Sequence, residues 1–369
     1  MSVIANKKGP QQPIPLTVLT GFLGAGKTTL LNRLLRDPAL ADTAVLVNEV
    51  GEIGLDHVLY QIIDEDIVLL ASGCLCCSVR GDLVSALENL LRGRDAGEMA
   101  EFRRVVIETT GLADPASVLH VIMTHPYLAL RYRLDGVVTV VDAVNGAGTL
   151  DAHVEALKQA AVADRIVLAK SDLAGAAGVA ALKARLARLN PAAPVLDAAK
   201  GEAGAAALLN AGLFDPARKV PDVARWLADA AVHAAEHADH NHGHDHHHHD
   251  ERIRVFTIAT ETPIPAATLE LFLDLLRSVH GAKLLRLKGI VHLAEEPEQP
   301  VVLHAVQHVL HPPARLPTWP DDDRRSRLVC VTYDLDPAIV RRLFDAFLGV
   351  PRVDAPDAAA LTDNPLAIR

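Results

Sequence analysis

Eight residues near the N-terminus have the types and spacing of a phosphate-binding loop. The segment "GFLGAGKT", residues 21–28, fits G-x-x-x-x-G-K-[ST] and lies between an apolar run and a helical pattern, as this loop requires. Its glycines let the backbone turn N–H groups toward phosphate oxygens, Lys27 would contact the β- and γ-phosphates, and Thr28 would bind Mg²⁺. A glycine turn without a ligand would leave Lys27 unexplained. The predicted nucleotide contacts here are Gly21, Gly24, Ala25, Gly26, Lys27, Thr28 and Thr29.

Two further segments offer carboxylates at strand ends. The segment "VVIETTG" ends in Glu108 and Gly111, and "VNEVGEIGLD" offers Glu49 and Asp56 on a loop punctuated by glycine. Ligands of open α/β sheets gather at the carboxyl ends of the strands, so Glu108 is expected to face the same crevice as Lys27. The alternative is an ordinary strand-end carboxylate in solvent. Phosphoryl hydrolysis needs acids around Mg²⁺ and a group that places water, which these residues could supply.

The segment "LAKSDL" predicts the base contact. Lys170 can pack along a guanine ring, and the Asp172 carboxylate can accept hydrogen bonds from the N–H edge of the base. An equally simple interpretation is that Ser171 or Asp172 caps a helix.

Three of the four cysteines lie within four positions. Cys74, Cys76 and Cys77 follow the apolar run "IVLLASG", and Cys330 stands far away. Soft thiolates this close together suit Zn²⁺ or Co²⁺ better than Mg²⁺. Redox chemistry and simple burial are the alternatives.

Residues 233–251 hold nine of the eighteen histidines, and this tract predicts metal binding in a linker. Its candidate ligands are His240, His242, His244 and His246. The alternative is a solvated linker without a metal role.

The order of apolar runs indicates the elements that carry these residues. Continuous runs alternate with helical patterns as far as about residue 200, which predicts an α/β domain with a mostly parallel sheet. A helix over 223–235 closes it. After residue 251 the apolar residues alternate, which predicts a smaller α+β domain on a half-exposed, partly antiparallel sheet. The predicted divisions are 1–228, a flexible linker 229–251, and 252–369.

Composition narrows the functional class. The net charge of −10 argues against a broad nucleic-acid surface. No apolar run is long enough to span a membrane, and no signal peptide precedes the first strand, so a cytoplasmic location without membrane attachment is expected.

Together "GFLGAGKTTLLN", "NEVGEIGLD", "GCLCC", "ETTGLADP" and "AKSD" resemble the CobW-type GTPases, metal-handling P-loop proteins with a Cys-x-Cys-Cys motif. The resemblance covers most of residues 14–200, and the His-rich linker and smaller C-terminal domain also fit it. It implies that Glu49 and Glu108 are switch acids and that Cys76 and Cys77 lead metal binding. The guanine motif of that family begins with Asn, whereas this chain has Ala169.

The resemblance therefore implies a slow GTP hydrolase with GTP, Mg²⁺ and Zn²⁺ or Co²⁺ as its cofactors. In this interpretation GTP binding raises metal affinity, and hydrolysis releases the ion to a client metalloprotein or a cobalamin-pathway enzyme. Two alternatives remain open: a P-loop ATPase or kinase with redox-sensing cysteines, and a passive metal buffer.

Overall fold

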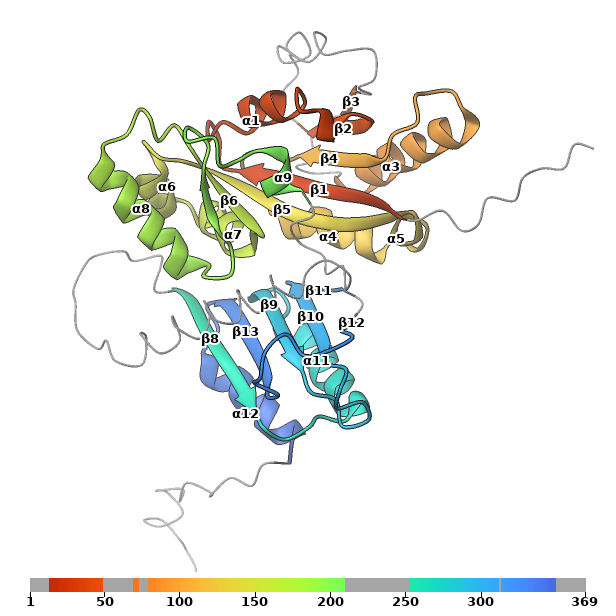
Figure 1. Cartoon of the computed structure of the whole chain (residues 1–369), viewed down its shortest axis with the longest axis vertical. Coiled ribbons are helices and arrows are strands. Elements are labelled where there is room, and N and C mark those ends of the chain that lie inside the picture. The colour runs from red at the N-terminus through yellow and green to blue at the C-terminus, as the bar shows by residue number, and fades with distance from the viewer. Residues whose placement is uncertain (1–12, 49–68, 73–78, 210–251, 312, 350–369) are drawn as a thin grey trace, which may run out of the picture.

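The computed structural model describes residues 13–48, 69–72, 79–209, 252–311 and 313–349. Two sheets organise this part of the chain. Strands that precede residue 210 in sequence form one sheet, and strands that follow residue 251 form the other (Figure 1).

The N-terminal sheet has seven parallel strands in the order β3-β2-β4-β1-β5-β6-β7. The central strand β1 is buried at seven of its eight positions because helices cover both faces of the sheet. The α/β fold with a parallel sheet is therefore confirmed. The strands are β1 (Ile14–Gly21), β2 (Thr43–Asn48), β3 (Leu69–Ser72), β4 (Arg104–Glu108), β5 (Tyr132–Asp142), β6 (Arg165–Ala169) and β7 (Val195–Asp197).

Two sets of helices cover this sheet. On one face lie α1 (Lys27–Leu34), the short 3₁₀ turn η1 (Pro38–Leu40) and α9 (Ala205–Leu208). The larger set shares the other face and forms the main core with the inner residues of the strands. Its members are α3 (Val79–Ala96), α4 (Pro115–Thr124), α5 (Pro126–Arg131), α6 (Gly146–Ala152), α7 (Val154–Val162) and α8 (Ala176–Leu189).

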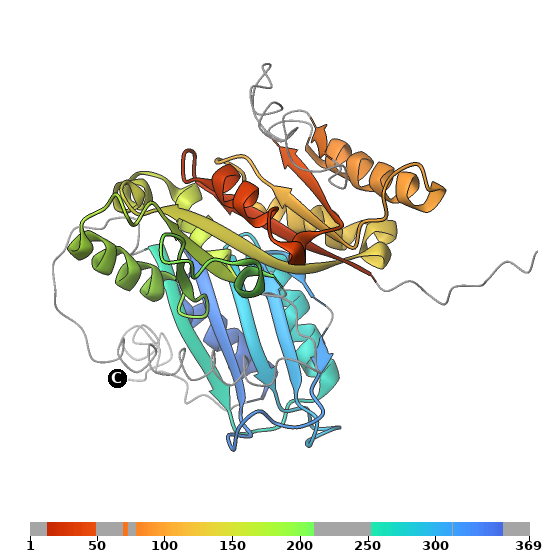
Figure 2. The same ribbon diagram turned by 45° about the horizontal axis from the view of Figure 1, so that its top comes forward.

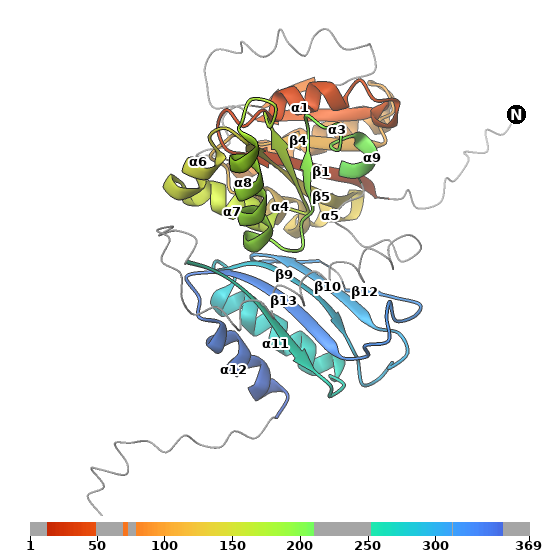
Figure 3. The same ribbon diagram turned by 60° about the vertical axis from the view of Figure 1, so that its left-hand side comes forward.

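The C-terminal sheet has the order β11-β10-β9-β13-β8, with β12 also pairing with β10. All of these strand pairings are antiparallel, whereas the sequence predicted a partly antiparallel sheet. Helices α11 (Ala266–His280) and α12 (Pro337–Phe347) lie on the face away from the N-terminal domain (Figure 3). The strands are β8 (Ile253–Thr260), β9 (Leu284–Val291), β10 (Val301–Val306), β11 (Val309–Leu310), β12 (Ala314–Arg315) and β13 (Ser326–Tyr333).

The second face of the C-terminal sheet is partly covered by the N-terminal domain. One end of its strands reaches that domain (Figure 2), and Ile253, Leu285, Val306 and Val331 belong to the same apolar core as α4, α7 and α8. The alternation of apolar and polar residues predicted a sheet with one exposed face. At the end of the strands nearest the N-terminal domain that face is instead buried, because these four apolar residues cluster there. The two domains share a packed interface.

Several predicted features lie outside the described residues: the helix over 223–235, the linker 229–251 and the loop beyond residue 48. Among the helices within the described ranges, none combines the length and the apolar character needed to cross a bilayer.

Candidate nucleotide-binding site

The phosphate-binding loop leaves the carboxyl end of β1 and turns directly into α1. Gly26 adopts the left-handed conformation, with φ of 98°, at the position that caps α1, and glycine accepts this conformation without steric cost. Lys27 Nζ donates hydrogen bonds to the carbonyls of Gly21, at 3.0 Å, and Phe22, at 3.2 Å. The ammonium group of Lys27 therefore lies inside the loop. A phosphate bound there would compete with these two carbonyls for its hydrogen bonds.

Thr28 and Glu108 meet beside this loop. Thr28 Oγ1 donates to Glu108 Oε1 over 2.7 Å, and Glu108 is only 4% exposed, unlike a strand-end carboxylate in solvent. Glu108 is held there because β4 pairs with β1, and the next residue, Thr109, donates its N–H to the carbonyl of Leu19 over 2.9 Å. Two oxygen ligands this close fit the hard ion Mg²⁺.

Gly111 brings the chain after Glu108 against the phosphate loop. A Cβ at this position would lie 2.5 Å from the backbone N of Leu23 and 2.6 Å from its Cδ2. Any larger residue would have to displace the phosphate loop or the 109–114 segment. Close approach of the backbone to Leu23 thus requires glycine at position 111.

A cavity of about 450 Å³ opens between α1 and the ends of β6 and β7. Thr29 and Arg33 line it from α1. Ala169 lines it from the end of β6, and Lys170 and Asp172 line it from the segment that follows. The cavity thus joins the predicted base contacts to the predicted phosphate contacts.

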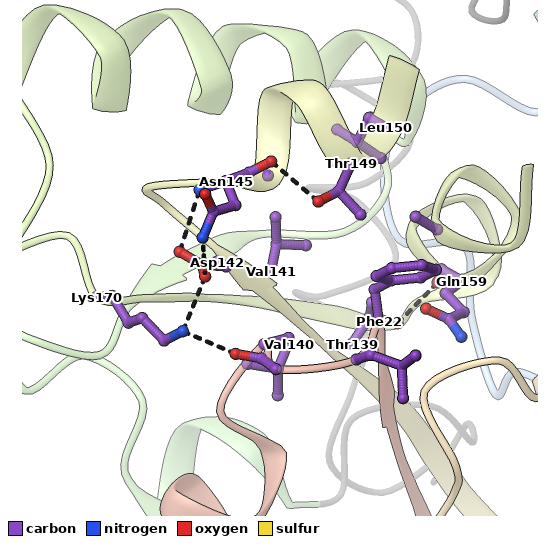
Figure 4. A pocket seen from close by; sticks show the side chains of 15 residues that line it. Phe22, Thr139, Val140, Val141, Asp142, Asn145, Thr149, Leu150, Gln159 and Lys170 are labelled. Atoms are coloured by element: carbon purple, nitrogen blue, oxygen red, sulfur yellow. Dashed lines mark hydrogen bonds and ion pairs between the residues drawn. The ribbon is translucent and has the colours of Figure 1, made fainter. Parts of the chain in front are cut away.

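Lys170 holds this region to the phosphate loop. Its Nζ donates to the carbonyl of Gly24 at 2.7 Å and to Asp142 Oδ2 at 2.8 Å (Figure 4). Burial alone would raise the pKa of Asp142, but hydrogen bonds from Lys170 and from Val144 and Asn145 hold it below its usual value. Asp142 therefore stays ionised and fixes Lys170.

The helix-cap interpretation of Ser171 and Asp172 is wrong, because α8 begins at Ala176 with Gly175 as its cap. Ser171 instead donates to the buried Asp197, which also accepts from Lys183 at 3.1 Å. Burial acts to raise the pKa of Asp197, yet these two donors lower it overall. An ionised Asp197 thereby ties the segment after β6 to β7.

Sequence reasoning missed three residues that organise the site: Asp142, Asp197 and Gln159. Asp142 and Asp197 each end an apolar run, so the strand-end pattern that selected Glu108 could have found them. Gln159, on α7, had no local signal. It lines a second cavity of about 180 Å³ beside Phe22 and Asp142 (Figure 4), and its Nε2 donates to two carbonyls of the loop after Glu108.

Glu49 and Asp56 lie outside the described part of the chain. The predicted ligands of Zn²⁺ or Co²⁺ also lie outside it, namely Cys74, Cys76, Cys77, His240, His242, His244 and His246. The backbone still locates the strand that precedes the cysteines. Val47 of β2 pairs with Ala71 of β3 on one side and with Glu108 of β4 on the other. At about 4.8 Å per strand, the end of β3 lies about 10 Å from Glu108.

The described residues contain no cluster of His, Cys, Asp and Glu that resembles a soft-metal site. Within those ranges no group of three His, Cys, Asp or Glu side chains could hold an ion. Cys330 is buried in the C-terminal core, where burial raises the pKa of its thiol to about 12. This thiol therefore stays protonated and serves as packing.

A glycine-rich loop at the end of a parallel strand, with lysine, threonine and a buried acid around it, defines a P-loop nucleotide-binding protein. Residues 15–197 match the family described as "CobW/HypB/UreG, nucleotide-binding domain", and residues 253–348 match "Cobalamin synthesis protein cobW C-terminal domain". The chain belongs to this family, as the resemblance in sequence predicted.

Individual relatives cover nearly the whole chain. "Zinc chaperone YjiA" of Escherichia coli K12 is 33% identical over 332 residues, which span 90% of this chain and 98% of the relative. "Zinc chaperone CobW" of Sinorhizobium sp is 31% identical, over 92% of this chain and 98% of the relative. The crystal structure of Zn(II)-bound YjiA GTPase from E. coli superposes with a TM-score of 0.65 at 27% identity, covering 91% and 99% of the two chains. The chain thus belongs to a family of P-loop enzymes that includes named GTPases.

Proposed function

We propose that this protein is a GTP-dependent zinc chaperone. In this proposal the ion is the cargo, held by Cys74, Cys76 and Cys77, and GTP hydrolysis controls its release to a client metalloprotein. Two relatives of nearly the same length are named zinc chaperones, which favours Zn²⁺ over Co²⁺ and favours a chaperone over a kinase or a passive buffer.

The observation that carries the proposal is the contact between Thr28 and Glu108 at the sheet edge where β3, the strand that precedes the cysteines in sequence, also ends. Thr28 and Glu108 would hold Mg²⁺, which supplies charge stabilisation for the phosphates when bound. Lys27 would neutralise the β- and γ-phosphates from inside the loop. Glu108 and the segment that follows it would orient the attacking water.

The base would occupy the cavity of about 450 Å³ beside Ala169. Asp172 lines this cavity and would accept from the N–H edge of guanine. Lys170 would flank the ring, with its Nζ fixed by Gly24 and Asp142. Adenine has an acceptor at N1 and no 2-amino group, so it cannot offer a carboxylate the paired N–H donors of guanine, and Asp172 favours GTP over ATP.

The strand order supports the proposed coupling between nucleotide and metal. The end of β3 is separated from Glu108 by one strand, β2, and both loops that leave β2 and β3 start at this edge. When Mg-GTP orders the loop containing Glu49, it would also order the cysteine segment and raise zinc affinity. Hydrolysis would remove that order and release the ion.

Transfer of zinc to a metal-free acceptor protein tests this function. Lys27→Ala removes phosphate binding without touching the cysteines. The proposal predicts that Mg-GTP turnover accelerates transfer from the wild type and has no effect on transfer from Lys27→Ala. A passive buffer would give the same transfer rate for both proteins, with or without GTP.

A further inference from the structure

Two glutamine side chains from other parts of the fold hold the loop that follows Glu108. Gln159 Nε2, on α7, donates to the carbonyl of Gly111 at 3.0 Å and to that of Ala113 at 3.1 Å. Gln307 Nε2, in the C-terminal domain, donates to Asp114 Oδ2 at 2.9 Å. The loop 109–114 is thus fixed by both domains.

The beginning of the same loop is fixed to the phosphate site. Thr109 Oγ1 donates to Thr20 Oγ1 at 2.9 Å, next to the phosphate-binding loop. Gly111 packs so closely on Leu23 that no side chain fits between them. Six residues therefore span the distance from the Thr28–Glu108 contact to the C-terminal domain, and they have little freedom to absorb a displacement.

Gln307 is itself held firmly. It lies in the tight turn between β10 and β11 with φ of 50°, and its neighbours Val306 and Val309 are buried in the core of the N-terminal domain. Asp114 is equally constrained, because its Oδ1 accepts from the N–H of Ala116 and caps α4. The hydrogen bond between Gln307 and Asp114 thus joins two rigid elements.

The same face of the C-terminal sheet is anchored beside α7. Arg286 donates to the carbonyl of Val162, at the end of α7, and pairs with the buried Asp164. Lys288 lies 3.4 Å from the same carboxylate. The C-terminal domain therefore contacts both the helix that carries Gln159 and the loop that Gln159 holds.

We propose that Gln307 is a positioning residue for GTP hydrolysis. Through Asp114 it fixes the 109–114 loop, and this loop keeps Glu108 against Thr28 and the backbone at Gly111 against the phosphate loop. The docked C-terminal domain thereby sets the hydrolysis rate of the nucleotide domain. This inference depends on the GTPase activity proposed above.

The test changes the polarity of the contact in the full-length protein. Gln307→Ala removes the hydrogen bond, and Gln307→Glu places a second carboxylate against that of Asp114. Gln307→Glu combined with Asp114→Asn restores the hydrogen bond, with the donor now at position 114 and the acceptor at position 307. The asparagine retains an oxygen that caps α4. Lys158→Ala is the matched control, because its ammonium contacts the Tyr333 ring across the same interface, 5.5 Å from the ring centre, without touching the loop.

We expect kcat to fall about fivefold in Gln307→Ala and about tenfold in Gln307→Glu, and to return to within about twofold of wild type in the double variant. The KM for GTP and the unfolding midpoint should stay at wild-type values throughout, and Lys158→Ala should keep the wild-type kcat. A fall in kcat at an unchanged unfolding midpoint is a result that a merely stabilising contact would not give, and recovery in the double variant assigns this fall to the contact between positions 307 and 114.

Wild-type kcat in Gln307→Glu, or a double variant no faster than Gln307→Glu alone, would overturn the positioning role. If either result were found while the wild-type protein hydrolysed GTP, the proposed GTPase activity would still stand. A wild-type protein that does not hydrolyse GTP would overturn the proposed activity and this inference together.

Discussion

Thr28 Oγ1 donates a 2.7 Å hydrogen bond to Glu108 Oε1 and so joins residues 80 positions apart at the carboxyl edge of the parallel sheet. This contact brings the first turn of α1 and the end of β4 to one place. Both side chains can offer oxygen to one hard cation, and the charge of Glu108 is the larger contribution.

Replacing Glu108 by glutamine tests that contribution. Glu108→Gln keeps the size of the side chain and removes its negative charge, so GTP turnover should fall by about a hundredfold. Phosphate release measured over a range of Mg²⁺ concentrations should reach half of its maximal rate only at a higher Mg²⁺ concentration than in the wild type, because the variant binds Mg²⁺ more weakly. Glu98→Gln, at an exposed position, is the control and should behave as wild type. Wild-type turnover in Glu108→Gln would remove this residue from the site.

Ala169 lines the cavity of about 450 Å³ proposed for the base, here called the base cavity, and its methyl group cannot hydrogen-bond to guanine. An asparagine at this position should therefore sharpen the selection of guanine over adenine. The side chain of Ala169 faces Gly26, where a Cβ would lie 3.7 Å away, and it lines the base cavity. Ala169→Asn adds an amide for the O6/N7 edge of guanine, worth about 1 to 2 kcal/mol, so the ratio of GTP to ATP affinity should rise about tenfold. Fluorescent nucleotide binding measures both affinities. An unchanged ratio would mean that the base does not occupy this cavity.

Acid should weaken the C-terminal domain through its buried histidines. His304 and His311 stack with ring centres 4.7 Å apart, and His304 pairs with Lys288 on the sheet face that also carries Arg286. Burial lowers the pKa of His311 from 6.5 to about 4, and burial together with the neighbouring His311 holds the pKa of His304 well below its usual value. Between pH 6.5 and 4 the unfolded chain therefore binds protons that the folded chain excludes, and stability falls as pH falls.

For His311 alone this loss approaches about 3 kcal/mol at pH 4. Urea unfolding of wild type and of a variant with both histidines changed to phenylalanine measures it. The variant should lose most of the slope of stability against pH across this window. An equal slope in both proteins would assign the acid sensitivity to other groups.

The ion pair between Arg286 and Asp164 should be essential for stability. Both side chains are buried, and although burial acts to raise the pKa of Asp164, Arg286 and Lys288 hold it well below its usual value. Arg286→Met leaves the carboxylate with Lys288 and the backbone N–H of Val137 as partners, at a cost of about 3 to 5 kcal/mol. Urea unfolding should show a smaller loss when Asp164→Asn is added, because the buried charge is then gone. Additive losses would contradict a direct pair.

The sequence predicted the parts of this site that depend on local pattern. The phosphate loop, the parallel strands and Glu108 all follow from runs of neighbouring residues, and the structure places Thr28 and Glu108 in contact. Asp142 had the same strand-end pattern but was overlooked. Gln159 and Gln307 carry no such pattern, because each matters only through a partner that packing brings to it, 48 and 193 positions away.

The C-terminal sheet shows the same limit in another form. Alternating residues in β8 and β13 predict a sheet with one buried face. They do not reveal that Ile253, Leu285 and Val306, from three different strands, meet at one end and form an interface with the N-terminal domain. That arrangement depends on antiparallel pairing between distant segments, which no short window of sequence contains.

Control of zinc binding by the nucleotide is tested most directly by zinc affinity, measured by competition with a chromophoric chelator. The protein would be studied without nucleotide, with Mg-GDP and with a Mg-bound non-hydrolysable GTP analogue, as wild type and as Cys76→Ser combined with Cys77→Ser. Residues 233–251 would be deleted from both so that their histidines do not bind the metal. We expect the GTP analogue to raise the zinc affinity of the wild type, and the double variant to lose both the affinity and its dependence on nucleotide. Equal wild-type affinity in all three nucleotide states would contradict this expectation.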